Sequence, residues 1–330
     1  MPKIEDVAEK AGVSVTTVSR VLNNRGYISE KTRDRVYQVM KELNYQPNEM
    51  ARALFRRRSN MIGLIIPTVA HPFFSELAYY LEYYADQKGF KILLCNSNRN
   101  VSKERKYIEM LKKNQVDAII MGSSTLDVEH YLNLNLPMVS FDRVLGENIP
   151  LVTSDNYMGG KLAARLLIDK GCKQPALLYR GVGGPHHEGM LASRRVQGFA
   201  EELQGAGLQP MYLELESSDS NDGGSEDDIA AFLERNSNVD GVLASSDIIA
   251  AEVMEACHRI QKRIPDQIKL IGYDDVKVAS LVSPRLTTIK QPIREMSERT
   301  IELIAKQVEG ETIDSLTHSF PVALIERGTT

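Results

Sequence analysis

The sequence lacks the features that would assign it to a membrane, a secretory route or a disulfide-linked fold. It contains no run of about 18 apolar residues, the length that a membrane-spanning helix needs. Its first ten residues, MPKIEDVAEK, hold no apolar segment of the kind found in secretion signals. Its three cysteines, Cys95, Cys172 and Cys257, are far apart and form no C-x-x-C pair. We therefore expect reduced, buried thiols in a cytoplasmic protein without a membrane partner.

The motifs of common enzyme classes are also missing. The sequence has no H-E-x-x-H pair, no G-x-S-x-G nucleophile turn, and its GVGG segment lacks the G-K-[ST] ending of a phosphate-binding loop. His186, His187 and Glu188 in GGPHHEG resemble metal ligands, but adjacent side chains do not face one way on a helix or a strand. We therefore predict a loop there, at the rim of a ligand cleft, and no enzyme activity, cofactor or metal site.

The formal charge of the chain, −4 in total, is unevenly distributed. Residues 1–60 contain 12 Lys and Arg against 7 Asp and Glu, a net charge of +5, and the rest of the chain carries −9. A basic head on an acidic body indicates that the head meets a polyanion such as DNA. Uneven solvation of an ordinary surface explains the same difference, so charge alone leaves both interpretations open.

The first 60 residues show the apolar spacing of short helices. Three stretches each place apolar residues on one helical face: Ile4, Val7 and Ala8, then Val18, Val21 and Leu22, then Val36, Val39, Met40 and Leu43. Gly12 separates the first two stretches, and Ser14 is a suitable N-cap for the second. The third follows Ser29 and ends at Asn44 and Pro47. We therefore expect three helices with a tight turn around a small core.

Residues 48–60, NEMARALFRRRSN, form a basic stretch that is compatible with a helix. An isolated helix shorter than about 12–15 residues is marginal in water. We therefore expect a linker that folds only when another surface supports it.

From Met61 onward, short apolar runs alternate with amphipathic stretches. The runs predicted as buried strands are MIGLII, FKILLC, VDAIIMG, LPMVSF, ALLY, VDGVLA and IKLIGY. The stretches predicted as helices are 73–88, 101–113, 156–170, 188–205, 247–260 and 293–309. Repeated βα units indicate doubly wound parallel sheets, and about 270 residues exceed one core, so we predict an α/β fold with two similar lobes. Such folds bind ligands at the carboxyl ends of their strands or between lobes.

Four segments resemble the lactose/galactose repressor (LacI/GalR) family of transcriptional regulators, and the resemblance covers essentially the whole chain. They are DVAEKAGVSVTTVSRVLN, SEKTRDRVYQVMKELNYQPNEMARAL, IGYDD and LTTIKQP, in the family's order and spacing. The resemblance implies a helix-turn-helix headpiece at 1–46, a hinge helix at 47–60 and a two-lobed body like that of periplasmic binding proteins. The implied lobes comprise 61–160 with 292–320, and 161–291 with 321–330.

In that family the second headpiece helix enters the major groove of DNA, and here it spans about residues 15–23. Val15, Thr16 and Arg20 match the base-reading positions. An arginine that donates two hydrogen bonds to guanine contributes ~1–3 kcal/mol of base discrimination. The residues suited to phosphate contacts are Thr17, Ser19 and Asn23. The plainer interpretation, in which Val15 packs and Arg20 is only solvated, leaves the complete motif unexplained.

The resemblance makes 47–60 a hinge helix that pairs with its copy in a homodimer and wedges a leucine into the minor groove. Leu54 in ARALFRR matches that leucine, and the cost of unstacking is offset by wrapping and phosphate contacts. Arg52 and Arg56–Arg58 supply basic groups for phosphates, which predicts strongly salt-dependent binding. Asn48 is also expected among the DNA-binding residues. Ordinary packing of Leu54 against the first lobe is the alternative.

The resemblance also implies an effector site in the body. The segment HPFF supplies His71, Phe73 and Phe74, whose aromatic faces suit the C–H faces of a sugar ring. Further positions that line the cleft in sugar-binding relatives are Asp142 and Arg143 in SFDR, Arg195 in SRRVQGF, Ser246 in LASSD, Asp274 in IGYDD and Gln291 in TIKQP. Paired donors and acceptors reject ligands that lack the matching hydroxyls. Each residue also has a structural interpretation: the phenylalanines as core, the aspartates as caps and the glutamine as a backbone support.

Two positions narrow the expected effector. Asparagine is usual in ribose-type members where this chain has His71 and Ser246, which puts ribose in doubt. Sucrose-operon repressors of low-GC Gram-positive bacteria depart at the same positions. Segments similar to that subgroup are NNRGYISEKT, CNSNRN, KERKYIEMLKKNQVDAII and FDRVLGENIPLVTSDN, whereas LNYQPNEMARAL is similar to ribose-operon repressors. We expect a sucrose-type sugar or a sugar phosphate, with ribose next.

The expected function is repression of a sugar-utilisation operon, with a sugar inducer that releases the protein from a near-palindromic operator. The sequence ends at VALIERGTT without a heptad tail, so we expect a homodimer rather than a tethered tetramer. One open alternative is a catabolite-control-type regulator whose corepressor is a phosphorylated carrier protein (a phosphocarrier) docked on the first lobe. Another is a sugar-binding receptor without a regulatory role, which needs export and leaves the basic head unexplained.

Overall fold

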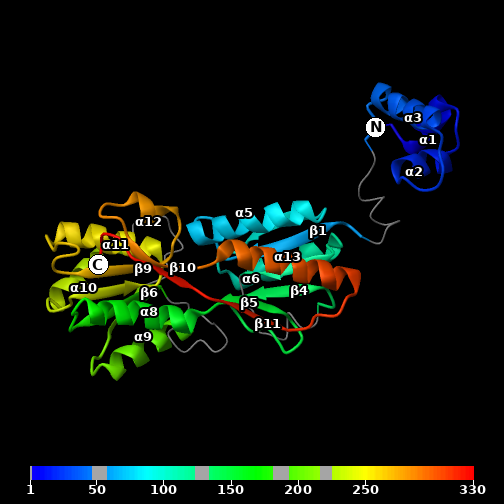
Figure 1. The fold of residues 1–330 in the computed structure, drawn as a ribbon. Coiled ribbons are helices and arrows are strands. Elements are labelled where there is room, and N and C mark those ends of the chain that lie inside the picture. The colour runs from blue at the N-terminus through cyan, green and yellow to red at the C-terminus, as the bar shows by residue number, and fades with distance from the viewer. Residues whose placement is uncertain (1, 47–57, 123–133, 181–192, 216–224) are drawn as a thin grey trace. The chain divides into compact units, whose positions relative to one another are not determined.

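The computed structural model divides into two units (Figure 1), one of residues Met1–Ser59 and one of residues Asn60–Thr330. The structure describes residues 2–46, 58–122, 134–180, 193–215 and 225–330. The segment expected to form the hinge helix lies for the most part outside these ranges, as does the GGPHHEG stretch. Within the described ranges, no helix has the length and apolar character needed to cross a membrane.

The first unit is built from α1 (Ile4–Ala11), α2 (Val15–Leu22) and α3 (Glu30–Glu42). Gly12 ends α1 with a φ of 60°, in the left-handed region that costs glycine little. The hydroxyl of Ser14 then accepts a hydrogen bond from the Thr17 N–H (3.1 Å) and begins α2. The core joins all three helices and consists of Val7, Ala8, Ala11, Val18, Val21, Val36, Val39 and Met40. The expected three-helix unit with a tight turn is confirmed.

The second unit contains two six-stranded sheets. The first has the order β11-β5-β4-β3-β1-β2, and its neighbouring strands are parallel. Its strands are β1 (Met61–Ile66), β2 (Lys91–Asn96), β3 (Ala118–Met121), β4 (Met138–Phe141), β5 (Leu151–Ser154) and β11 (Thr317–Phe320). One face packs against α5 (Pro72–Gln87) and α13 (Ile293–Glu309), and the other face packs against α6 (Val101–Lys113).

The second sheet has the order β12-β10-β9-β8-β6-β7 and is parallel except for the edge pair β10–β12. Its strands are β6 (Pro175–Arg180), β7 (Met211–Leu215), β8 (Gly241–Ala244), β9 (Lys269–Asp274), β10 (Thr287–Lys290) and β12 (Ala323–Ile325). One face packs against α10 (Glu226–Arg235), α11 (Asp247–Arg259) and the short α12 (Lys277–Leu281). The other face packs against α8 (Asn156–Asp169) and α9 (Ser193–Gly205).

Helices on both faces explain why the strands read as continuous apolar runs rather than as alternating ones. In β1, for example, every residue from Ile62 to Ile66 is buried. Cys95, Cys172 and Cys257 are buried and unbridged, and burial raises the pKa of each thiol to about 11. The predicted α/β fold with two parallel-sheet lobes is confirmed.

The chain passes between the two sheets from β5 to α8, from β10 to α13 and from β11 to β12. Helix α8 packs on the second sheet from its first turn. A Cβ on Gly159 would lie 2.2 Å from Tyr273 Oη of β9, and a Cβ on Gly160 would lie 2.0 Å from the Arg195 carbonyl oxygen of α9. The expected lobe boundary at residue 160 therefore falls inside α8, and we place the start of the second lobe at Asn156.

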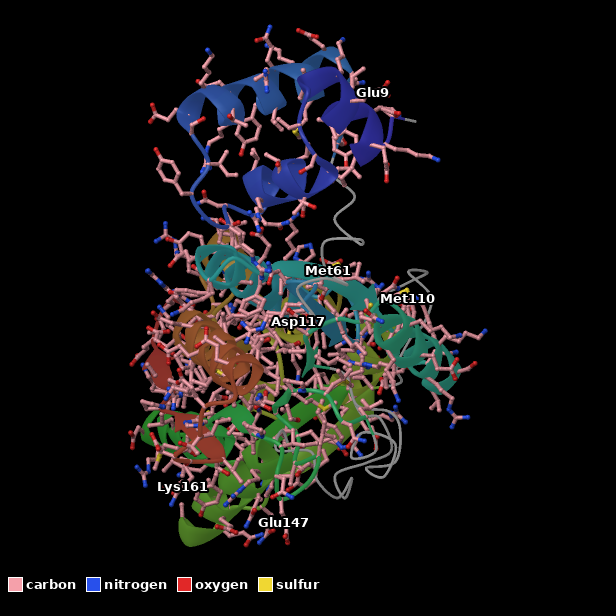
Figure 2. All side chains as sticks on the ribbon, turned by 90° about the vertical axis from the view of Figure 1, so that its right-hand side faces the viewer. Glu9, Met61, Met110, Asp117, Glu147 and Lys161 are labelled. Atoms are coloured by element: carbon pink, nitrogen blue, oxygen red, sulfur yellow. The ribbon has the colours of Figure 1, made fainter. Side chains whose placement is uncertain are left out.

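The amino end of the first sheet is joined by hydrogen bonds at the start of the body. The Asn60 N–H donates to Asp117 Oδ2 (2.9 Å), and the Asp117 N–H donates to the Met61 carbonyl oxygen (2.8 Å). Figure 2 labels Met61 and Asp117 at this edge. Because the strands are parallel, their carboxyl ends gather at the opposite edge of this sheet, where the expected effector residue Asp142 directly follows β4.

Candidate functional site

The exposed face of α2 carries the residues predicted to read DNA bases. Val15, Thr16 and Arg20 are exposed, and 39% of Val15 is accessible despite its apolar side chain. On the opposite face, Val18 and Val21 are fully buried in the three-helix core. The helix therefore presents one apolar group, one hydroxyl and one guanidinium on a single outward surface.

The residues predicted to contact phosphates take part in local hydrogen bonds. The hydroxyl of Thr17 lies 2.9 Å from that of Ser14, at the beginning of α2. The Asn23 side-chain amide donates to the Ser19 carbonyl oxygen (2.8 Å) and, at 3.4 Å, to the Ser19 hydroxyl. These bonds hold the ends of α2 in place. The other predicted DNA contacts, Asn48, Arg52 and Leu54, lie outside the described residues.

In the body, several predicted effector residues lie at the carboxyl ends of strands. Asp142 directly follows β4, Asp274 is the last residue of β9, and Gln291 directly follows β10. Ser246 lies two residues after β8. Ligands of doubly wound folds bind at this edge of the sheet.

Gln291 links the second sheet to the first. Its side-chain amide donates to Asp274 Oδ1 (2.7 Å), and its carbonyl oxygen accepts from the hydroxyl of Ser154 (2.6 Å). Ser154 ends β5 and Gln291 follows β10, so two of the passages between the sheets meet in this chain of bonds. All three side chains are buried.

Arg195 of α9 is held in one orientation by three neighbours. Its Nη2 donates to Asn156 Oδ1 (2.7 Å), its Nε donates to the same oxygen (3.2 Å), and its Nη1 donates to the Ser245 carbonyl oxygen (2.7 Å). Its guanidinium carbon lies 3.3 Å from the centroid of the Tyr273 ring, a cation–π contact. Only 8% of Arg195 is exposed, so its charge is poorly hydrated and favours polar or anionic partners.

Asp142 joins the same network from the first sheet. Its Oδ1 accepts from the Thr153 hydroxyl (2.5 Å) and from the Asn156 amide (3.4 Å), so Asn156 bridges Asp142 and Arg195. Asp142 has a φ of 56°, an uncommon backbone conformation for a residue other than glycine. Such conformations often occur at functional sites, where the surrounding structure holds them.

Burial shifts the ionisation of three predicted effector residues. It raises the pKa of Asp142 and raises the pKa of Asp274 well above its usual value, while the charge of Arg195 opposes both shifts. Burial also lowers the pKa of His71 to about 4. Nearby positive charges add to that shift, and they belong to Arg99, Arg180 and Arg195. His71 is therefore a neutral imidazole at pH 7, able to donate one hydrogen bond and accept another.

The HPFF segment serves partly as structure. His71 Nδ1 accepts from the Phe73 N–H (3.3 Å) and caps α5. Phe73 is buried in the core of the first lobe, with its ring centroid 6.3 Å from that of Phe141. Phe74 is only partly buried and packs edge-on against His71 and Phe73. Of the two aromatics, Phe74 is therefore the better placed for a ligand.

The remaining predicted residues also have local roles. The Ser246 hydroxyl accepts from the Ile249 N–H (3.3 Å) and caps α11. The Arg143 carbonyl oxygen accepts a short hydrogen bond from the Ser140 hydroxyl, and the Arg143 side chain is half-buried. Among the described residues, no group of three or more His, Cys, Asp and Glu side chains is placed to hold a metal ion.

Sequence reasoning did not name Ser154, Asn156 or Tyr273, which connect the predicted residues to one another. The signal available for Ser154 and Asn156 was VTSDN, a short polar stretch in which the strand β5 ends and α8 begins. Tyr273 reads as an ordinary core aromatic within IGYDD. The network that these residues complete offers donors and acceptors in alternation, which suits a ligand with several hydroxyl groups.

Comparisons with known proteins identify relatives of both parts of the chain. The family model described as bacterial regulatory proteins, lacI family, matches residues 3–48, and a periplasmic binding protein-like domain matches residues 164–330. The ribose operon repressor of Halalkalibacterium halodurans is 40% identical over 100% of this chain and 97% of that protein. The sucrose operon repressor of Streptococcus mutans is 38% identical over 98% of both chains. The crystal structure of the lac repressor dimer bound to operator and an anti-inducer is similar with a TM-score of 0.85 and 27% identity, over 99% of this chain and 98% of that one.

Proposed function

The chain belongs to the lacI family of bacterial regulatory proteins, and on that premise we propose that it is a DNA-binding repressor of a sugar-utilisation operon, active in the cytoplasm. The observation that carries this function is the presence of two sites in one chain. The α2 surface of Val15, Thr16 and Arg20 is exposed for base contacts, and the body holds a buried polar network suited to a polyol.

The DNA contact follows from the chemistry of α2. Arg20 donates to guanine, Val15 contacts an apolar surface such as a thymine methyl, and Thr16 bonds either type of base. As a homodimer, the protein places two such helices on the two halves of a near-palindromic operator. Leu54 of each hinge segment wedges into the minor groove, with Asn48 and Arg52 beside it on the backbone. The positive charge of the head supports binding and makes it salt-dependent.

The effector binds at the carboxyl ends of the strands, where Asp142, Arg195, Asp274 and Gln291 exchange hydrogen bonds within the protein for bonds to sugar hydroxyls. Phe74 packs against the ring. Neutral His71, whose Nδ1 already accepts from the Phe73 N–H, supplies its Nε2–H as a further donor. Arg143 and Ser246 stand at the edge of the site, while Phe73 supports it from the core. Relatives are named for both ribose and sucrose operons. We favour a sucrose-type sugar or its phosphate because His71 and Ser246 replace the asparagines usual for ribose, with ribose as the second candidate.

Effector binding releases the operator by changing how the two lobes meet. Gln291 and Ser154 sit at two of the passages between the sheets, so a ligand that recruits Asp274 and Gln291 alters the bonds there. A change between the lobes moves the two hinge segments of the dimer relative to one another and weakens their fit to DNA. Such coupling is reciprocal, so operator DNA weakens sugar binding by the same factor.

The experiment is a selection from random duplexes with purified protein, followed by anisotropy titrations of the selected duplex with and without sugars. Sucrose, sucrose phosphate, D-ribose, ribose phosphate and a phosphorylated carrier protein are added separately. We expect an inverted repeat and a weaker complex with one of these sugars. Failure to select any sequence contradicts the repressor assignment. Release or retention of DNA that depends on a phosphorylated carrier protein instead of a sugar supports the catabolite-control alternative.

A further inference from the structure

Asp247, the first residue of α11, is an acid that the proposed sugar contacts leave unused. Its side chain is fully buried, with 0% of the residue exposed. Each carboxylate oxygen has its own partner. Oδ2 accepts from the Val276 N–H (2.8 Å), and Oδ1 accepts from the Thr288 hydroxyl (2.5 Å). Asp247 therefore joins three separate segments of the second lobe.

Each of these segments carries a predicted effector residue. Ser246 directly precedes Asp247, Asp274 lies two residues before Val276, and Gln291 lies three residues after Thr288. The same carboxylate thus fixes the backbone turn after β9 and a side chain of β10. Asp274 and Gln291 hydrogen-bond to each other at 2.7 Å. The Asp247 carboxylate therefore holds the segments that carry both of these residues.

The turn after β9 needs such support because its backbone is unusual. Asp274 has a φ of 111° and Asp275 a φ of 58°, both in regions that residues other than glycine seldom adopt. Conformations of this kind persist only where neighbouring contacts over-determine them. The contacts here are the Asp247–Val276 bond on one side and the ion pair between Asp275 and Arg327 (2.6 Å) on the other.

The packing around Asp247 shows that its place is specific. A Cβ on Gly272 would lie 2.4 Å from Asp247 Oδ1, so a glycine in β9 is required to admit the carboxylate. Burying a carboxylate costs free energy unless hydrogen bonds or an opposite charge compensate for the lost hydration. Burial raises the pKa of Asp247 to about 7, even though both of its hydrogen bonds lower it. An apolar residue would fill the space without that cost, but it would leave the Val276 N–H unsatisfied.

We propose that Asp247 is a positioning residue for effector recognition, which acts by holding the turn after β9 so that Asp274 and Gln291 keep their paired geometry. It does not touch the effector itself and acts only through these segments. The sugar part of this inference rests on the proposed function. The support of the turn does not, so the two can be tested separately.

The first test needs no ligand and follows amide hydrogen exchange at Val276 in the full-length protein. In Asp247→Ala both hydrogen bonds are lost, and we expect the exchange to become about tenfold faster or more. In Asp247→Asn the amide oxygen still accepts from Val276 and the amide nitrogen donates to the Thr288 oxygen, so we expect exchange close to wild type. Unchanged exchange in Asp247→Ala overturns the proposal.

The matched control is Asp240→Ala. Asp240 also bonds one group with each carboxylate oxygen, but both groups are backbone N–H groups, those of Lys173 (2.6 Å) and Gln174 (2.9 Å), at the amino edge of the same sheet. It should lower stability without changing exchange at Val276. If Asp240→Ala accelerates hydrogen exchange at Val276 as much as Asp247→Ala does, the effect reflects a general loss of stability and the positioning role is wrong.

The second test titrates the full-length wild type and variants with sucrose and with D-ribose by calorimetry. For the sugar that binds wild type, we expect about tenfold weaker binding in Asp247→Ala, recovery in Asp247→Asn, and unchanged operator affinity without sugar in both. Equal sugar affinity in all variants contradicts a role in recognition. If neither sugar binds wild type, neither unphosphorylated sugar is the effector, and the exchange result alone decides the support of the turn.

Discussion

The side-chain amide of Gln291 donates a 2.7 Å hydrogen bond to the carboxylate of Asp274. Asp274 ends a strand of the second sheet, and Gln291 lies where the chain leaves that sheet for α13. A ligand that bonds to Asp274 is therefore separated by one side chain, that of Gln291, from a passage of the chain between the lobes. Under the proposed function, effector recognition and operator release would share these two side chains.

Asp274→Ala should give a repressor that stays on its operator when inducer is present. Losing hydrogen bonds to a charged group costs ~1.5–3 kcal/mol each, so sugar should bind at least about tenfold more weakly. Operator affinity without sugar should be kept. Anisotropy titrations with labelled operator and increasing sugar measure both properties. Asp266→Ala, an exposed aspartate of the same lobe, is the control, and normal induction of Asp274→Ala would remove that residue from the site.

Arg20→Ala should relax base preference rather than abolish binding. The head keeps its remaining positive charge, so affinity for arbitrary duplexes should change little, while discrimination at one base pair should fall by ~1–3 kcal/mol. Selection from random duplexes, compared with wild type, measures this change. Arg35→Ala removes an exposed charge of α3 and is the matched control. An equal loss of affinity for all sequences in Arg20→Ala identifies a phosphate contact instead.

Leu54→Ala should weaken binding to the selected operator and leave sugar affinity intact. A wedged leucine lets the duplex bend and wrap more of the protein, so its loss should act on specific complexes more than on arbitrary DNA. Operator affinity measured at several salt concentrations, beside sugar affinity by calorimetry, separates the two effects. The wedge role fails if specific and nonspecific affinities fall together or if neither changes.

The fold was largely predictable because helices cover both faces of each sheet, which leaves continuous apolar runs such as MIGLII and IKLIGY. The strands β5 (LVTS), β10 (TTIK) and β11 (THSF) were not predicted, since each has only four residues and is rich in hydroxyl side chains. Thr288, for instance, is fully buried, and its hydroxyl bonds to Asp247, 41 positions away. No local pattern contains that partner.

The placement of the candidate site residues was predictable in part for the same reason. Residues that directly follow an apolar run, such as Asp142 and Asp274, lie at the carboxyl edge because strand direction fixes that edge. Asn156 begins a helix after an unpredicted strand, so its bridge between Asp142 and Arg195 depends on tertiary contacts. The neutral state of His71 likewise depends on burial and on arginines from other segments.

Gly160→Ala should destabilise the protein. A Cβ there would lie 2.0 Å from the Arg195 carbonyl oxygen and 2.7 Å from the Phe199 nitrogen, so α8 and α9 must move apart. Overpacking of this kind costs ~1–3 kcal/mol or more, and the shift also displaces Arg195. Gly205→Ala, at the end of α9, meets no atom within 4 Å and should be neutral or slightly stabilising. Urea unfolding of both variants measures the difference, and equal stabilities contradict close packing of α8 on α9.

Asp247 should make the stability of the protein fall as pH rises. Burial raises its pKa in the folded protein from 3.8 to about 7, with the charge of Asp275 adding to the shift and that of Arg327 opposing it. Between these two values the folded state holds a proton that the unfolded chain has released, so the free energy of unfolding declines through this window and levels off above about pH 7.

Asp247→Asn removes this titration and keeps both hydrogen bonds. The free energy of unfolding of the variant, relative to that of wild type, should therefore increase with pH. A proton retained over two further pH units corresponds to about 2–3 kcal/mol, which is the change we expect in the difference between the two proteins from pH 5 to pH 8. Urea unfolding at four pH values measures it, and subtraction cancels the titrations that both proteins share. Parallel profiles would mean that Asp247 is ionised in the folded protein throughout this range. If the variant becomes more stable relative to wild type as pH rises, the Asp247 carboxyl group lowers the stability of wild type at neutral pH while it holds the turn that carries Asp274.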